Sequence, residues 1–279
     1  MMQIKQARKT FNPGTVNEKR AIAGVDLSVE EGDFITVIGG NGAGKSTLLN
    51  LISGTYPLDS GEILLNSGGG AGDAGGVLAD RFINIGRLPE HKRARYVARV
   101  FQDPMMGTCG GMEIQENLAL AYRRGKPRTL RWAIGKSEKE LYHNALKRLD
   151  LGLESRMSAK VKLLSGGQRQ ALTLLMATLQ RPDVLLLDEH TAALDPKTAA
   201  RVQKLTTELT EESNITTVMI THNMRDAIKY GNRLIMMNEG NIIYEARGQE
   251  KAALKVEDLL RKFESNAGGQ TLSDRMILG

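Results

Sequence analysis

The first residues whose types and spacing point to chemistry form a glycine-rich loop, GGNGAGKS, at residues 39–46. The loop fits the pattern G-x-x-x-x-G-K-[ST] and stands between an apolar strand-like stretch and a helix-like stretch. Glycines at this spacing let backbone N–H groups converge on a phosphate, and Lys45 adds a point charge to the β- and γ-phosphates. The Ser46 hydroxyl is a candidate Mg²⁺ ligand. The loop therefore predicts binding of a nucleoside triphosphate.

Two acids stand where a second apolar stretch, VLLLDEH, leaves its predicted strand. Strand ends of this kind are where α/β sheets bind ligands. Asp188 can hold Mg²⁺ directly or through water. Glu189 is the nearest candidate general base for a water that attacks the γ-phosphorus. This pair predicts hydrolysis rather than binding alone.

A second helix start, at residues 163–175, also suits an anion. Ser165 can cap the helix, and Gly166 and Gly167 leave its backbone N–H groups uncovered. An uncovered helix N-terminus attracts phosphate. The chain thus contains two phosphate-directed elements that are far apart in sequence.

With LSGGQRQ preceding LLLDEH by one helix length, the chain resembles the ATP-binding cassette family over nearly its whole length. In this resemblance, residues 39–47 match the Walker A loop, residues 164–168 the signature motif, residues 184–189 Walker B and residues 193–195 the aspartate loop. Gln102 in VFQDP matches the Q-loop, and His222 in ITHN matches the switch histidine.

The resemblance implies ATP and Mg²⁺ as cofactors and assigns roles to particular residues. The implied catalytic residues are Glu189, His222 and Gln102, and the implied metal ligands are Ser46, Gln102 and Asp188. The implied nucleotide-contacting residues are Phe11, Gly39, Asn41, Gly42, Gly44, Lys45, Ser46, Thr47, Ser165, Gly166, Gly167, Gln168 and Asp195.

Simpler interpretations exist for three of these side chains. Gln102 can be an exposed loop glutamine, His222 a helix-capping residue, and Phe11 a packing aromatic instead of a ring stacked on adenine. His91, His143 and Cys109 have no partners at metal-ligand spacing, so we assign them to surface or core.

In this family the capped helix completes the ATP site of a second copy, arranged head to tail. The physics supports this arrangement, because a γ-phosphate carries charge that a second helix N-terminus can stabilise. ATP then holds two subunits together and hydrolysis lets them part. Asp195 lies at that interface in the resemblance.

The implied fold is α/β: a P-loop NTPase (RecA-like) core with an antiparallel β subdomain and an inserted α-helical subdomain. We expect one cassette over residues 1–279, with its core in residues 1–103 and 165–250, helical subdomain in 104–164, and a short C-terminal helix and tail in 251–279. Two features depart from the family: His190 stands where many members carry proline, and the glycine-rich tract at residues 67–76 is long.

Composition limits the cellular setting. The chain has 279 residues, one cysteine and a net charge of +6, but only 4% aromatic residues for stacking on single-stranded nucleic acid. Much of the basic excess lies in residues 123–136, which suits either a solvated face or a surface near anionic lipid. No apolar run approaches the roughly 18–20 residues of a membrane helix, and the N-terminus does not resemble a signal peptide. We therefore expect a cytoplasmic protein, peripheral on the inner face of the cell membrane.

A lone cassette with no membrane span looks like the ATPase subunit of a multi-component transporter. The segment beginning PMMGTCGG, after Gln102, would receive an integral membrane permease. We expect import of an amino-acid-like solute, aromatic amino acids included, with an extracytoplasmic solute-binding protein and no nucleic acid as partner. The alternatives are a soluble ABC ATPase of iron–sulfur cluster assembly and a nucleic-acid-remodelling ATPase.

Overall fold

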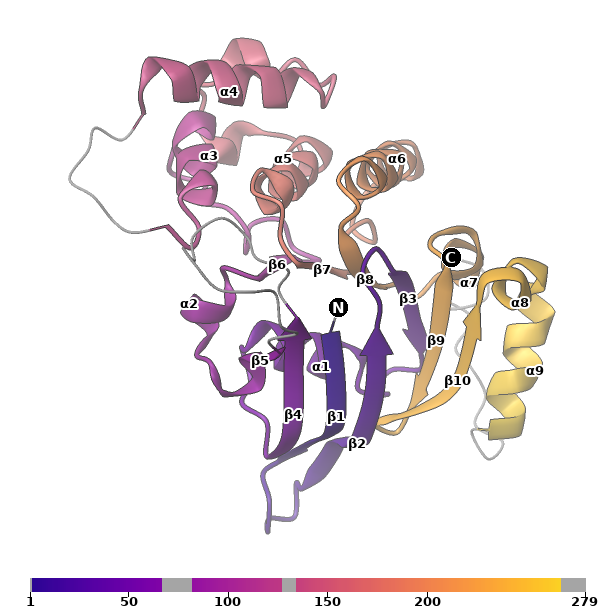
Figure 1. Ribbon diagram of the computed structural model, residues 1–279. Coiled ribbons are helices and arrows are strands. Elements are labelled where there is room, and N and C mark those ends of the chain that lie inside the picture. Colours follow the sequence, from indigo (N-terminus) through magenta and orange to yellow (C-terminus); the bar gives the residue numbers. More distant parts are fainter. Residues whose placement is uncertain (1, 67–81, 127–133, 267–279) are drawn as a thin grey trace, which may run out of the picture. The chain divides into compact units, whose positions relative to one another are not determined.

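The computed structural model describes residues 2–66, 82–126 and 134–266, and it divides into two compact units (Figure 1). The first unit comprises residues 1–96 and 216–279, and the second comprises residues 97–215. The glycine-rich tract at 67–76, part of the basic run (127–133) and the C-terminal tail from 267 lie outside the described residues.

An antiparallel sheet in the first unit contains four strands in the order β2-β1-β4-β5 (Figure 1). Its strands are β1 (Met2–Phe11), β2 (Lys19–Val29), β4 (Ser60–Asn66) and β5 (Phe82–Asn84). Alternate residues such as Met2, Ile4, Ile63 and Leu65 are buried, so one face of the sheet contributes to the core.

The first unit also contains parallel strands whose apolar runs are almost wholly buried. They are β3 (Phe34–Gly39), β8 (Thr216–Ile220) and β9 (Arg233–Asn238), and β10 (Asn241–Arg247) completes a hairpin with β9. β3 pairs in parallel with β8 on one side and with β9 on the other. Continuous burial is typical of parallel strands covered on both faces.

The described part of the first unit also contains short helices. They are α1 (Lys45–Ser53), α2 (Glu90–Arg93), α7 (Met224–Lys229), α8 (Gly248–Ala253) and α9 (Val256–Asn266), with a 3-10 turn at Ile85–Arg87. Of these, α1 and α7 pack against β3, and α8 packs against β9 and β10. α9 lies beside β10 in Figure 1, and its Leu259 and Phe263 pack into one buried cluster with Ile38 and Met236. The β9–β10 hairpin turns at Glu239–Gly240, and α9 is the C-terminal helix of the described residues.

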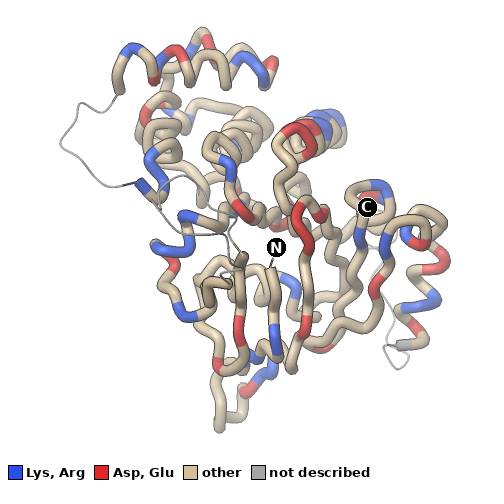
Figure 2. The backbone as a smooth tube through the Cα atoms, in the orientation of Figure 1, with Lys and Arg blue, Asp and Glu red and all other residues tan. Residues whose placement is uncertain are grey.

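The described part of the second unit contains one parallel strand pair and four helices. The strands are β6 (Val97–Val100) and β7 (Val184–Asp188); the helices are α3 (Ile114–Tyr122), α4 (Lys136–Lys147), α5 (Gly166–Thr178) and α6 (Pro196–Glu212), with 3-10 turns at Glu154–Arg156 and Val161–Leu163. α4 carries acidic and basic residues along its length (Figure 2), and within it only Tyr142 and Leu146 are buried. The α/β fold class expected from the sequence is confirmed.

Candidate nucleotide-binding site

The phosphate loop leaves β3 and closes on itself before α1 begins. The Ala43 N–H donates to the Gly40 carbonyl at 3.2 Å, and the Leu48 N–H donates to the Gly44 carbonyl at 2.8 Å. Gly44 precedes the helix with a φ of 102°, in the left-handed region. A β-carbon there would lie 2.5 Å from the backbone oxygen of Ala21, so only glycine permits this close approach.

The turn of the β9–β10 hairpin is hydrogen-bonded to the phosphate loop. The Gly240 N–H donates to the Ala43 carbonyl at 3.0 Å, and the Ala23 N–H donates to the Gly240 carbonyl at 3.0 Å. These two bonds connect the loop to β2 through the turn of the hairpin. The loop is therefore positioned by segments some twenty residues before it and two hundred residues after it.

Lys45 directs its ammonium group into the loop. Its Nζ donates to the carbonyl oxygens of Gly39 at 2.6 Å and Gly40 at 3.0 Å. Asn41, Gly42 and Ser46 are exposed around it. The ammonium group and the N-terminus of α1 together provide positive charge and N–H donors, which suits the phosphates of a nucleotide. Thr47, the next residue, is half-buried in the first turn of the helix.

A second lysine lies beside the loop and was not singled out from the sequence. Lys19 begins β2, and its Nζ lies 3.2 Å from the point that a β-carbon on Gly42 would occupy. The side chain is exposed and adds another positive charge beside the loop. No spacing rule links Lys19 to the loop, because contacts between segments that are distant in the sequence bring them together.

His222 follows β8, the strand adjacent to β3. The Thr221 N–H donates to the Val37 carbonyl at 3.2 Å, so the chain leaves β8 at the same sheet edge as the phosphate loop. The next helix, α7, is capped by Asn223, whose Oδ1 accepts from the N–H groups of Arg225 at 2.9 Å and Asp226 at 3.2 Å. Asn223 thus fills the capping role that was the simpler interpretation of His222.

Phe11 ends β1 with a half-buried ring. The ring meets Tyr56 edge to face, with centroids 5.2 Å apart, and the Nζ of Lys9 lies 5.8 Å from its centroid. The geometry supports a packing role, and stacking on adenine stays a prediction.

In the second unit, β7 carries Asp188 and Glu189 out of the core. The four preceding residues, 184–187, are fully buried, whereas both acids are half-buried. Asp188 Oδ2 accepts a hydrogen bond from Arg99 Nη2 at 2.6 Å. Glu189 has a φ of 44°, a left-handed conformation that costs an ordinary residue on the order of 1 kcal/mol. This strain turns the chain sharply at the residue proposed as the base.

His190, the departure from the family pattern, is a buried residue that the sequence did not explain. Its Nε2 lies 3.0 Å from the Thr206 hydroxyl on α6, and that hydroxyl donates to the Val202 carbonyl at 2.9 Å. The hydroxyl therefore accepts from Nε2–H of the histidine. Burial lowers the pKa of His190 to about 4, which keeps the ring neutral. The pair ties the segment after Glu189 to α6.

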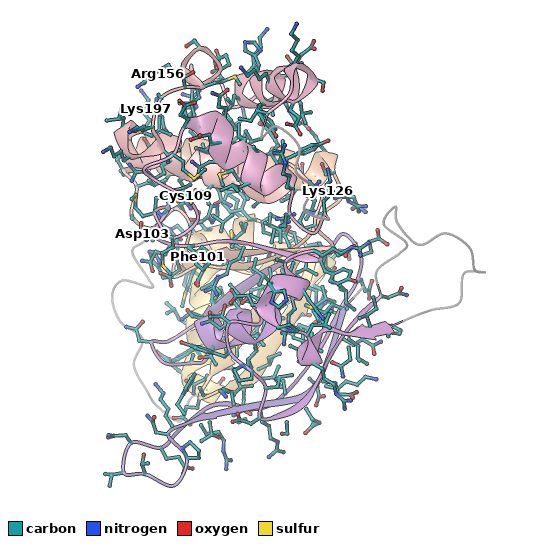
Figure 3. The ribbon with its side chains drawn as sticks, turned by 90° about the vertical axis from the view of Figure 1, so that its left-hand side faces the viewer. Phe101, Asp103, Cys109, Lys126, Arg156 and Lys197 are labelled. Carbon is teal, nitrogen blue, oxygen red and sulfur yellow. The ribbon has the colours of Figure 1, made fainter. Side chains whose placement is uncertain are left out.

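Gln102 is exposed just after β6. The residue before it, Phe101, is held by its carbonyl oxygen, which accepts from Gln170 Nε2 on α5 at 3.2 Å. Figure 3 shows Phe101, Asp103 and Cys109 along one side of this unit, in the segment between β6 and α3. The strand fixes where this segment starts, and the exposed amide of Gln102 is available to a ligand.

The N-terminus of α5 has the capping box expected from the sequence. The Gln168 N–H donates to Ser165 Oγ at 3.2 Å, and the Ser165 N–H donates to Gln168 Oε1 at 3.2 Å. Ser165 and Gly166 are exposed. A β-carbon on Gly167 would lie 2.1 Å from Thr198 Cγ2, so this glycine permits α5 and α6 to pack closely.

Asp195 caps α6 in the same unit. Its Oδ1 accepts from the Thr198 N–H at 3.1 Å. The hydrogen bonds with Thr198 lower the pKa of this exposed carboxyl, and further backbone N–H donors in the first turn lower it as well. Thr198 therefore contacts both elements: its N–H donates to Asp195, and its methyl group packs against Gly167 at the start of α5.

The residues expected to bind the nucleotide are distributed over both units. The first unit holds Phe11, the phosphate loop and His222, and the second holds Gln102, the acidic pair and the start of α5. Among the residues that the structure describes, no group of three His, Cys, Asp or Glu could hold a metal ion. A metal at this site would need ligands of other kinds, such as hydroxyl and phosphate oxygens.

A glycine loop that opens a helix after a buried strand, with an acidic pair ending another, defines a P-loop nucleotide hydrolase. The family model "ABC transporter" matches residues 22–192. The chain therefore belongs to the ABC transporter family, and it is an ATP-binding ATPase subunit of a transporter.

Similar proteins of known name agree with this assignment. The chain is 44% identical to a tyrosine transport ATP-binding protein of Clostridioides difficile, over 95% of this chain and 99% of that protein. It is 30% identical to the phosphonates import ATP-binding protein PhnC of Alcaligenes faecalis, over 88% of this chain and 82% of that protein.

Solved structures of ATP-binding cassettes show the same fold. One is the dimeric structure of a post-hydrolysis state of a cassette bound to ADP and Pi. It matches with a TM-score of 0.72 and 27% identity, over 88% of this chain and 98% of that one. Within the described ranges of the present chain, no helix combines the length and apolar character needed to cross a membrane.

Proposed function

We propose that this chain hydrolyses ATP to drive import of an amino-acid-like solute, tyrosine or a related aromatic amino acid, through a separate membrane permease. The observation that carries the proposal is the 44% identity to a tyrosine transport ATP-binding protein over nearly the full length of both chains. The import-type names of more distant relatives, for phosphonates and methionine, support the direction of transport. These names favour a transporter over iron–sulfur cluster assembly or nucleic-acid remodelling.

The phosphate loop binds the triphosphate in this proposal. Lys45 and the N-terminus of α1 face the β- and γ-phosphates, and the exposed hydroxyl of Ser46 lies in the same turn. Ser46, Gln102 and Asp188 would hold Mg²⁺, which supplies charge neutralisation at the phosphates when bound. The donor set fits such an ion, because all three side chains present oxygen atoms.

Glu189 is the proposed base. Its carboxylate orients the attacking water and accepts a proton from it, and His222 contacts the γ-phosphate from the end of β8. Lys19 adds charge beside Gly42 and is proposed as a further phosphate contact. Replacing Glu189 with Gln removes the proton acceptor with little change in shape, so we expect binding to persist while hydrolysis is lost.

The start of α5 is proposed to complete the ATP site of a second copy, head to tail. Ser165 and Gly166 are exposed there, and the uncovered N–H groups of a helix start favour an anion. Gly167, Gln168 and Asp195 would lie at the same interface. The match to a dimeric cassette structure supports the pairing of two copies.

The permease is proposed to dock on the second unit, after Gln102. Met105, Met106 and Leu163 expose 43%, 70% and 64% of their surfaces. Gly110 lies between Met105 and the residue before Leu163: a β-carbon on Gly110 would be 3.2 Å from Met105 Cε and 3.5 Å from Lys162 Cβ. Exposed large apolar residues close to one another are typical of interaction sites.

The basic run at residues 123–136 contributes less to a membrane-facing surface than its composition predicts. Arg123 pairs with Glu138 at 3.0 Å, and Arg124 donates to the carbonyls of Ala177 at 3.1 Å and Gln180 at 2.8 Å. These two charges serve packing within the unit. Residues 127–133 lie outside the described residues, so their placement near lipid stays a prediction.

We further propose that the chain is cytoplasmic and peripheral on the inner face of the membrane, with an extracytoplasmic solute-binding protein as a third component. The subdomain boundaries at residues 104 and 164 and the C-terminal segment from 251 are part of the same proposal. The helices at Ile114–Tyr122 and Lys136–Lys147 support an inserted helical part.

Uptake measurements test the proposed function. Cells lacking their own copy would be complemented with the wild-type chain, with Lys45→Ala or with Gly40→Ala, whose added β-carbon meets only Phe263 Cζ at 3.8 Å. We expect labelled tyrosine to enter with the wild type and Gly40→Ala but not with Lys45→Ala. Capture from detergent-extracted membranes should yield a polytopic partner. Unchanged uptake of tyrosine, methionine and phosphonate by Lys45→Ala cells would contradict the proposal.

A further inference from the structure

Arg99 is a charged residue in a strand that is otherwise apolar. Its neighbours Val97, Ala98 and Val100 are buried in β6, and its side chain is itself only 10% exposed. Arg99 aligns with Leu186 in the parallel pairing of β6 and β7, and it reaches two residues further along β7 to Asp188. A cation placed this way in a buried strand has a specific partner.

The partner is the carboxylate proposed to hold Mg²⁺. Arg99 Nη2 lies 2.6 Å from Asp188 Oδ2, and the Asp188 side chain is 14% exposed. The guanidinium carbon also lies 4.6 Å from the ring centroid of Phe101, which shields it further. With little water around either group, their attraction is stronger than that of a surface ion pair.

We propose that Arg99 acts as a built-in counter-charge that occupies Asp188 when no metal is bound and competes with Mg²⁺ for it. The inference rests on the proposed role of Asp188 as a metal ligand. An arginine and a divalent cation at one carboxylate repel each other, and both draw on the same lone pairs. Arg99 thereby raises the Mg²⁺ concentration that is required for metal-dependent nucleotide binding. It also keeps the part-buried carboxylate of Asp188 paired when no metal is bound.

Two other roles for Arg99 lead to different outcomes. If the ion pair only holds β6 against β7, removing it lowers stability but leaves the Mg²⁺ dependence where it was. If Arg99 contacts the phosphates, removing it weakens nucleotide binding with and without metal. Competition for Asp188 alone predicts that loss of the arginine makes the site more sensitive to Mg²⁺.

The test is a Mg²⁺ titration of binding of a fluorescent ATP analogue, in a Glu189→Gln background that does not turn over. Arg99→Met should lower the midpoint Mg²⁺ concentration by about tenfold, equivalent to about 1.4 kcal/mol. Arg99→Lys keeps the charge and should stay close to the parent. Arg123→Met removes a more exposed ion pair, with Glu138, elsewhere in the same unit and should leave the midpoint unchanged. An unchanged or higher midpoint in Arg99→Met overturns the inference.

Asp188→Asn separates failure of the inference from failure of the proposed function. If this variant shows the parent's Mg²⁺ midpoint, Asp188 is not a metal ligand and the proposed metal site is wrong. If it raises the midpoint while Arg99→Met changes nothing, only the competition is wrong.

A measurement without substitution of Arg99 covers the case in which Arg99→Met does not fold. In the Glu189→Gln protein with ATP bound, the Arg99 side-chain N–H resonances should shift when Mg²⁺ is added. Resonances that stay in place throughout the titration overturn the inference.

Discussion

The phosphate loop after β3 and the start of α5 are both glycine-containing helix starts, yet they are built differently. Gly44 and Ala43 are buried, and backbone groups of Ala21 and Gly240 contact them directly. Ser165 and Gly166 are exposed, and their helix is secured by its own capping box. The comparison teaches that the loop is preorganised by its own unit, whereas the start of α5 presents its N–H groups outward.

Gly44→Ala should break the preorganised loop and has the largest expected effect. The left-handed φ and the contact with the Ala21 oxygen together predict a cost of about 4 kcal/mol. ATP binding, measured at equilibrium, should fall by a factor on the order of a thousand. Gly40→Ala is the matched control, because its φ is not in the left-handed region. Equal losses in the two variants would show that backbone contact does not shape the loop.

The start of α5 packs against α6. His190 in turn connects α6 to the segment after Glu189 through its hydrogen bond with Thr206. The ring has a pKa of about 4 in the folded chain against about 6.5 in the unfolded chain, so the unfolded chain binds more protons in this range. His190 therefore contributes up to about 3 kcal/mol above pH 6.5, and the contribution is lost as pH falls through 4. Unfolding free energies of the wild type and His190→Gln should converge between pH 7 and pH 4. Parallel pH profiles would rule out the buried neutral ring.

Gly167→Ala tests whether close packing of α5 on α6 positions the exposed helix start. The added carbon meets Thr198 Cγ2, a movable side-chain atom, so we expect a cost of about 2 kcal/mol. ATP-dependent association, measured by sedimentation, should weaken while ATP binding by single chains stays unchanged. Thr198→Ser removes the clashing methyl and should restore association. Persistent weakness in the double variant would indicate that Gly167 is needed for contact with a partner rather than for packing.

Ser165→Ala removes one capping bond and has the smallest expected effect. Losing an N-cap side chain costs about 1 kcal/mol, and the loss should appear as faster hydrogen exchange in the first turn of α5. The phosphate loop should show no change in exchange. A change in both places would mean that the two regions are less independent than the comparison implies.

The sequence predicts the parts of this molecule that local pattern controls. The loop at residues 39–46, the buried strands that lead to it and to Asp188, and the cap at Ser165 all follow from spacing and residue type. The hairpin turn at Gly240 is also predictable, but its hydrogen bond to Ala43 is not. That contact depends on pairing between strands two hundred residues apart.

The features missed from sequence are contacts between distant segments. Arg99 was visible as a charge in an apolar strand, which was the one available signal, but the position of Asp188 beside it depends on the register of β6 and β7. His190 departs from the family pattern, but its bond to Thr206 depends on the position of α6, which the sequence pattern does not give. Lys19 had no signal in its sequence surroundings.

The most direct test of the account is the size of Glu189→Gln in solution with and without MgATP, with bound nucleotide quantified in each sample. We expect a single chain without nucleotide and a pair of chains with ATP, and we expect no pair when Ser165→Glu is added, because an acidic side chain would repel the γ-phosphate. A Glu189→Gln protein that binds ATP fully and remains a single chain would contradict the claim that the start of α5 completes the nucleotide site of a second copy.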